Sequence, residues 1–139
     1  MSEQQNTALV QSLYAAFAKG DVQTILDNLT SDVEWTLEGP SILPFAGKRH
    51  GVAEVKKFFE ALAGTQTNMK LTPQQFVAQG EMVAIIGRYS ATVTATGKGF
   101  DGPLAHFFTI RAGKVVRFID VADTAAMVDA YQSASAAGR

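Results

Sequence analysis

The first apolar residues of the chain recur at the spacing of a helix. One face of this predicted helix carries Leu9, Val10, Leu13, Tyr14 and Phe17, at i, i+1, i+4, i+5 and i+8. Gly20 suits the left-handed position that commonly ends a helix. Asp21 can cap a second helix whose apolar residues lie between 22 and 29. The N-terminal region is therefore predicted to be a pair of helices with a very short connection.

Between residues 32 and 64 the spacing of apolar residues predicts a strand, a loop and a helix in turn. Residues 32–37 alternate, with Val33, Trp35 and Leu37 on one face, which predicts a short strand. Residues 38–48 hold two glycines and two prolines and are predicted to be a loop. A third helix is predicted from about residue 51 to Gly64, with an apolar face formed by Val52, Val55, Phe58, Phe59 and Leu62.

From residue 69 onward the period is two. The predicted strands cover residues 69–79, 81–95, 99–112 and 114–122, with a turn signal between each pair. Tight turns predict an antiparallel meander. Pro73 indicates an edge position or a bulge, and Gly87 is a candidate bulge site because strands this long must bend. Asp123 is predicted to cap a last helix over 124–132, followed by a frayed tail over 133–139.

Helices followed by a long-stranded meander indicate an α+β fold with the helices on one face of the sheet. Long twisted strands curl around a packed helix, and partial cover of the concave face leaves a pocket at one end. The convex face also needs cover, and a second copy of the chain is the simplest one. We therefore expect one domain over residues 1–139, with its core at about 8–132, that forms a homodimer through the convex face.

Composition narrows the functional classes. The 139 residues are 47% hydrophobic and 18% charged with a net charge of −1, so no basic surface for nucleic acid or anionic membrane is expected. The chain has no cysteine and two histidines, which argues against a disulfide framework, a thiol nucleophile or a usual zinc site. It shows no phosphate-binding or dinucleotide motif, and no cofactor is expected. No signal peptide or membrane span is predicted, and a cytoplasmic location is expected by default.

Four motifs, in this order and spacing, resemble the SnoaL-like branch of the nuclear transport factor 2-like superfamily, which includes ketosteroid isomerases and polyketide cyclases. They are residues 13–21 (LYAAFAKGD), 31–35 (SDVEW), 51–59 (GVAEVKKFF) and 105–123, from Ala-His-Phe to Asp123. The resemblance implies a cone-shaped, cystatin-like fold with a pocket between N-terminal helices and a curved antiparallel sheet. It does not imply one activity, because this fold hosts enzymes and non-enzymes.

Ketosteroid isomerases need an aspartate base, a tyrosine and a protonated aspartate. The resemblance places these groups on Leu37, Leu13 and Ala105, so all three are expected to be absent and steroid isomerisation by that mechanism is excluded. Tyr14 is one residue from the tyrosine position, about 100° around the helix.

If Ala105 faces the pocket, strand alternation predicts which other residues do. The expected ligand-binding lining is apolar and aromatic: Leu13, Tyr14, Phe17, Trp35, Leu37, Phe58, Phe59, Tyr89, Val93, Ala105, Phe107 and Phe118. Trp35 and Tyr89 are candidates for orienting a ligand by stacking and hydrogen bonding, with plain core packing as the alternative.

Asp120 is the main catalytic candidate, since the resemblance implies an acid/base carboxylate on the final strand. A carboxylate among aromatic rings is desolvated, which raises its pKa and suits proton transfer next to a carbonyl. The alternative is a structural salt bridge with Arg88 or Arg117. His106 is the second candidate: the predicted register points it to the convex face, whereas a register shifted by one brings it into the pocket beside Asp120. His50, with Lys48 and Arg49, is placed at the pocket rim or in a solvated loop.

Three functions fit these observations. The first is a cofactor-independent isomerase, cyclase, dehydratase or hydrolase that acts on a small apolar carbonyl compound through Asp120. The second is a module that binds a small hydrophobic ligand without converting it. The third is a dimeric scaffold with a vestigial pocket. The sequence leaves open whether the protein is an enzyme.

Overall fold

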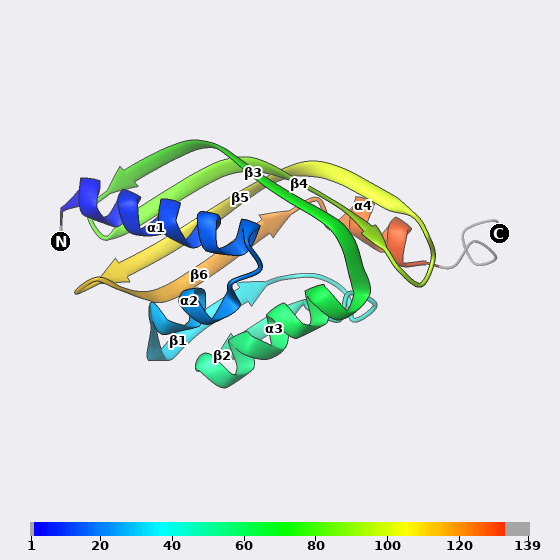
Figure 1. Ribbon diagram of the computed structural model, residues 1–139, viewed down its shortest axis with the longest axis horizontal. Helices are drawn as coiled ribbons and strands as arrows, with labels where there is room; N and C mark the ends of the chain where they lie inside the picture. The colour runs from blue at the N-terminus through cyan, green and yellow to red at the C-terminus, as the bar shows by residue number, and fades with distance from the viewer. Residues whose placement is uncertain (1, 133–139) are drawn as a thin grey trace.

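The computed structural model describes residues 2–132, which form four helices and one six-stranded sheet (Figure 1). The helices are α1 (Glu3–Ala18), α2 (Val22–Asp27), α3 (Val52–Thr65) and α4 (Thr124–Tyr131). The strands are β1 (Leu29–Leu37), β2 (Gly47–His50), β3 (Gln66–Gln79), β4 (Met82–Val93), β5 (Gly99–Arg111) and β6 (Lys114–Ala122). The predicted tail over 133–139 lies outside the described residues.

The sheet has the strand order β2-β1-β6-β5-β4-β3. The predicted meander is confirmed, because β3 to β6 pair with their chain neighbours in antiparallel fashion. The expectation of a wholly antiparallel sheet is wrong, since β1 pairs with β6 in parallel. Residues 47–50 were predicted to be loop, but they form β2 at the edge beside β1. The sheet is therefore mixed, and β1, the first strand along the chain, lies beside β6, the last.

Local signals explain the ends of several helices. Ser2 Oγ accepts a hydrogen bond from Gln5 N (3.1 Å) while Ser2 N donates to Gln5 Oε1 (2.9 Å), so a capping box begins α1 well before its apolar face. The predicted caps Asp21 and Asp123 are confirmed, since each side chain accepts a hydrogen bond from the first turn of its helix. The third helix was predicted to end at Gly64, but it ends one residue later, at Thr65.

All four helices lie on the concave face of the sheet. Figure 1 shows the long strands arching over α1, with α2 and α3 beside β1, and α4 at the end of the strands far from the N-terminus. The fold confirms an α+β architecture with N-terminal helices packed on a curved sheet, and the sheet does not close into a barrel. None of the helices in residues 2–132 combines the length and the apolar composition that crossing a bilayer requires.

The pairing of β3 with β4 shifts register at two places, and the second of them lies opposite Gly87. Pro73 pairs with Gly87 and Gln75 with Ile86, so one extra residue of β3 bulges out at this edge strand. The prediction of an edge position or bulge at Pro73 is confirmed, whereas the bulge predicted at Gly87 lies in β3 opposite that residue. A Cβ on Gly87 would lie 2.5 Å from the backbone oxygen of Thr72. Only glycine permits this close approach of the two backbones.

We expect Gly87→Ala to lower the free energy of unfolding by about 1–3 kcal/mol, because the methyl group forces the two strands apart at the bulge. Gly64→Ala is the matched control: it lies in α3, and a Cβ there meets nothing within 4 Å. That change should raise stability by about 0.5–1 kcal/mol through helix propensity. Urea unfolding of both variants tests this, and equal effects would contradict the role given to Gly87.

Candidate functional site

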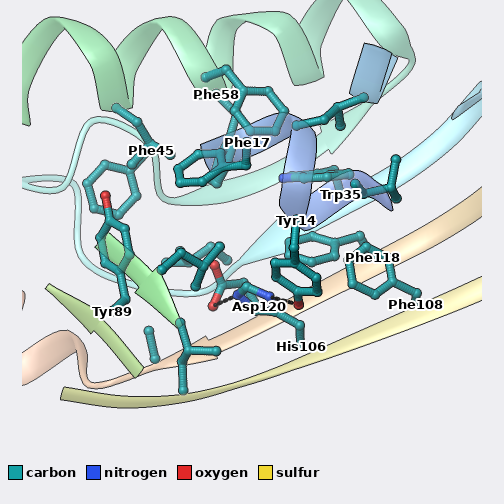
Figure 2. Close-up of a pocket in the computed structure, with 18 of the residues that line it drawn as sticks. Tyr14, Phe17, Trp35, Phe45, Phe58, Tyr89, His106, Phe108, Phe118 and Asp120 are labelled. Atoms are coloured by element: carbon teal, nitrogen blue, oxygen red, sulfur yellow. Dashed lines mark hydrogen bonds and ion pairs between the residues drawn. The ribbon is translucent and has the colours of Figure 1, made fainter. Parts of the chain in front are cut away.

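A cavity lies between the concave face of the sheet and the helices (Figure 2). The empty space between its side chains amounts to about 680 Å³, including the part that opens to solvent. The lining comes from every helix and from all strands except β2: Leu13, Tyr14, Phe17, Ile25, Trp35, Leu37, Phe45, Phe58, Phe59, Leu62, Leu71, Tyr89, Leu104, His106, Phe108, Phe118, Asp120, Ala122 and Met127. Most of these side chains are apolar or aromatic.

The polar groups of the lining gather around Asp120. The strand pair β5–β6 places His106 opposite Asp120, and the imidazole Nε2 lies 3.3 Å from the carboxylate Oδ1. On the other side of the ring, Nδ1 is 2.7 Å from the hydroxyl of Tyr14, which reaches in from α1. Figure 2 shows this row of tyrosine, histidine and aspartate on the floor of the cavity. His106 and Asp120 keep only 7% and 11% of their side-chain exposure, so both are held away from bulk water.

The electrostatics of the row favour one arrangement of protons. Burial, and after it the charge of Asp120, raises the pKa of Tyr14 far above its ordinary value of 10.0. The phenol therefore keeps its proton and donates a hydrogen bond to Nδ1 of His106. A neutral imidazole then carries its own proton on Nε2, the atom that faces Asp120. The ring is oriented from one side by Tyr14 and faces the carboxylate from the other.

Asp120 and His106 lie close together without a well-aligned hydrogen bond between them. The 3.3 Å separation meets the distance of an ion pair, but Nε2 and Oδ1 are both buried without a well-aligned hydrogen-bond partner. Neither arginine considered as a partner is near: Arg88 pairs with Asp101 at 3.2 Å on the outer surface, and Arg117 is exposed. The alternative role for Asp120, a salt bridge with Arg88 or Arg117, is thus wrong.

Aromatic rings form the wall next to this row. Trp35 and Phe118 are paired neighbours on β1 and β6, and their ring centroids lie 4.0 Å apart at an angle of 28°. Phe58 and Phe59 from α3 meet the indole edge to face, each at 5.7 Å. Such contacts hold flat rings in fixed orientations. This part of the cavity is suited to apolar, flat ligand groups.

A second polar group enters from β4. The hydroxyl of Tyr89 donates to Oε1 of the buried Gln66, whose Nε2 donates to the hydroxyl of Tyr131 on α4 (2.8 Å). Burial, followed by the influence of Tyr131 and then Asp120, raises the pKa of Tyr89 above its ordinary value. The Tyr89 phenol therefore stays neutral, and its oxygen can accept a hydrogen bond from a ligand.

The structure places most of the residues selected from the sequence in the lining. These are Leu13, Tyr14, Phe17, Trp35, Leu37, Phe58, Phe59, Tyr89, Phe118, His106 and Asp120. The placements of Ala105 and Phe107 are wrong: they lie on the outer face, because β5 turns Leu104, His106 and Phe108 inward. Val93 is buried but lies outside the lining. The alternative register, in which His106 enters the pocket beside Asp120, is the one the structure has.

The register of β5 was available from the sequence. Its even-numbered residues Leu104, Phe108 and Ile110 are bulkier and more apolar as a set than Ala105, Phe107 and Thr109. That comparison selects the even-numbered face for the core, whereas the family resemblance alone selected Ala105. Phe45 had no such signal, since it lies in the Pro- and Gly-rich segment before β2, yet it lines the cavity and packs against Phe58 and Tyr131.

The remaining candidates lie away from the cavity. His50 is exposed, and its backbone N donates to Glu54 Oε1, while Arg49 donates to the carbonyl oxygens of Pro44 and Glu54. Within residues 2–132, no three histidine or carboxylate side chains gather in a way that could hold a metal ion.

Comparisons with known proteins agree with this architecture. Residues 10–118 match the family model of the SnoaL-like domain. A nuclear transport factor 2-like protein of unknown function from Burkholderia pseudomallei is 30% identical, with 96% of this chain and 100% of that chain covered and a TM-score of 0.87. A nuclear transport factor 2-like protein from Burkholderia xenovorans is 29% identical, with 95% and 99% covered and a TM-score of 0.85. TerC, co-crystallised with polyporic acid, is 30% identical, with 93% and 99% covered and a TM-score of 0.83. A search of curated proteins finds no match.

The raised pKa of Tyr14 predicts how stability depends on alkaline pH. Below about pH 10 the phenol is protonated in both the folded and the unfolded chain, so it contributes no slope. Above that pH the unfolded chain releases this proton while the folded chain keeps it, so the free energy of unfolding falls as pH rises, by up to about 1.4 kcal/mol per pH unit. Tyr14→Phe should lower stability by about 1 kcal/mol at pH 8 and make this alkaline decline shallower. Urea unfolding between about pH 8 and 11 tests it, and an unchanged slope would show that Tyr14 does not titrate this way.

Proposed function

This chain belongs to the SnoaL-like family, and we propose that it is a cofactor-independent enzyme that moves a proton next to the carbonyl group of a small apolar compound. Asp120 is the acid/base residue in this proposal. The single observation that carries it is the position of Asp120: a carboxylate in an aromatic cavity, with a histidine at 3.3 Å and, among residues 2–132, no arginine paired with it.

The environment of Asp120 suits a general base. The surrounding rings exclude water, so little solvent competes for the carboxylate. His106 faces Oδ1 without a well-aligned hydrogen bond, so this oxygen is not committed to a hydrogen-bond partner. Tyr14 fixes the imidazole through Nδ1 and so holds that partner in one orientation.

The proposed step is proton transfer from carbon. A carboxylate oxygen of Asp120 takes a proton from the carbon next to the carbonyl, and the electron pair of the broken C–H bond moves to the carbonyl oxygen to give an enolate. The neutral carboxylic acid then returns the proton to the same or another carbon. Depending on the substrate, the enolate can instead close a ring or expel a leaving group. Isomerase, cyclase and dehydratase activities share this first step.

A binding module is the second candidate, because most of the cavity lining is apolar. The relative TerC was co-crystallised with polyporic acid, which supports a small organic ligand for this cavity under either reading. In a binding module, Asp120 and His106 would orient the ligand without exchanging protons with it.

We expect the protein to catalyse exchange of the acidic protons of β-tetralone, a small bicyclic ketone, in deuterated water. Asp120→Asn should lower this exchange by about 10²- to 10⁴-fold, because the amide cannot accept the proton. Asp101→Asn is the matched control: it changes the same chemical group in an exposed ion pair with Arg88 and should exchange at the wild-type rate. Proton NMR follows the loss of the ketone signals.

The two candidate functions separate in this experiment. Exchange that depends on Asp120 supports the enzyme. Binding of the ketone without exchange above the buffer rate would favour the binding module, and exchange that survives in Asp120→Asn would remove Asp120 from its proposed role.

We also propose that the chain forms a homodimer through the convex face of the sheet. Support comes from rows of apolar side chains in register across four strands. One row joins Val77, Ala84, Phe107 and Ile119, and the next joins Ile86, Ala105 and Val121. Ile86 and Val121 keep 50% and 54% of their exposure. A broad exposed apolar patch of this kind marks an interaction surface, and two identical sheets can cover each other around a two-fold axis.

Ile86→Glu should convert the dimer to a monomer at micromolar concentration, because two charges would be brought together in the interface. Ile42→Glu is the control, since Ile42 is similarly exposed at 40% but lies in the segment before β2. Light scattering coupled to gel filtration measures the mass. A wild-type monomer, or a dimer that survives Ile86→Glu, would contradict this surface.

A further inference from the structure

We infer that Trp35 is a hydrogen-bond donor to the ligand in the cavity, and that its indole N–H selects ligands with an oxygen acceptor. The inference rests on the proposed function for the identity of that acceptor, a carbonyl oxygen. Trp35 is thereby more than a member of the aromatic wall: it is a positioning residue with its own polar contact.

The indole nitrogen of Trp35 is buried without a hydrogen-bond partner. The residue is 3% exposed, and within the described part of the chain no side-chain or backbone acceptor pairs with Nε1. Buried tryptophan N–H groups usually find a partner, because an unpaired donor away from water costs free energy. Because Trp35 is one of the residues that line the cavity, a ligand whose oxygen reaches this nitrogen can be the missing partner.

The unpaired atoms are concentrated in this cavity. Five buried side-chain polar atoms in residues 2–132 lack a hydrogen-bond partner, and three of them belong to cavity-lining residues: Trp35 Nε1, His106 Nε2 and Asp120 Oδ1. Figure 2 shows the nitrogen of Trp35 at the end of the ring that faces the middle of the cavity. A donor and an acid/base pair thus share one enclosed space.

The indole cannot easily turn to find another partner. Phe118 stacks on it at 4.0 Å, and Phe58 and Phe59 close on it edge to face. Its strand is paired on both sides, by β2 and by β6. The N–H direction is therefore set before a ligand enters, which lowers the entropy cost of making the contact.

The strand register sets Trp35 at a useful separation from Asp120. Trp35 pairs with Phe118 and Leu37 pairs with Asp120 across the parallel strands β1 and β6. With strands about 4.8 Å apart and a rise of about 3.3 Å per residue, the α-carbons of Trp35 and Asp120 lie roughly 8 Å apart on the same face. One small molecule can reach both side chains, with its acidic C–H at Asp120 and its carbonyl oxygen at the indole.

This contact strengthens during the proposed step. The carbonyl oxygen gains negative charge as Asp120 removes the proton, and a fixed donor in a dry site stabilises that charge. A ligand of the same shape without an oxygen leaves the indole N–H unpaired, so the site discriminates against it.

The chain has a single tryptophan, so Trp35 can be observed by itself. The probes are β-tetralone and tetralin, which share a shape but differ in the carbonyl oxygen. The indole N–H proton resonance should move downfield with β-tetralone and not with tetralin. Biosynthetic replacement of Trp35 by benzothienylalanine, which has sulfur in place of N–H, should weaken β-tetralone binding roughly three- to tenfold and leave tetralin binding unchanged. Because the ring shape is kept, this replacement avoids the cavity that Trp35→Ala would create.

The same samples report proton exchange, so the two proposals fail separately. An indole resonance that moves equally with both probes, or equal binding losses for both in the benzothienyl protein, overturns the role of Trp35 even where exchange continues. A downfield shift specific to β-tetralone without exchange supports the donor and overturns the acid/base function.

Discussion

The pairing of a buried carboxylate with one histidine is the interaction on which the site depends. Asp120 is enclosed by aromatic rings, and removal of a charge from water is costly unless a partner compensates it. His106 is that partner, and Tyr14 holds it from behind. An arginine in place of the histidine would bind the carboxylate tightly and suppress its basicity. A histidine in this geometry places one polar ring nitrogen beside the carboxylate without the two parallel hydrogen bonds that an arginine can make.

The sheet geometry that creates this pairing is set elsewhere. The bulge of β3 and the absence of a side chain at Gly87 let the outer strands bend over α1. The helices on the concave face leave a cavity above Asp120. The same bend leaves the opposite face broad and apolar. The cavity and the exposed patch are thus two consequences of one curved sheet.

Much of the fold followed from the sequence, because hydrophobic period and turn residues determine local structure directly. The helix caps at Asp21 and Asp123 and the four-stranded meander are examples. The parallel pairing of β1 with β6 was missed because it joins distant segments and no local pattern records it. The strand β2 was missed for a similar reason: residues 47–50 have little strand character and are held by pairing with β1.

The candidate site was predicted in composition but not in register. Asp120, Phe118 and Trp35 were placed correctly from alternation, whereas a shift of one residue in β5 exchanged His106 for its neighbours. A period of two makes such an error complete, since every side chain of the strand changes face. The choice between the two registers needed the bulk of the whole strand to be weighed, and not one anchoring residue.

The parallel contact between β1 and β6 also constrains how the protein is made. The floor of the cavity consists of the first strand and the last, so it cannot form on the ribosome until nearly the whole chain has emerged. Until then β1 is paired only with the short β2, and Trp35 has α3 as a neighbour but not Phe118. Long-range pairing of this kind slows folding, since the ends of the chain must meet before their contacts stabilise anything.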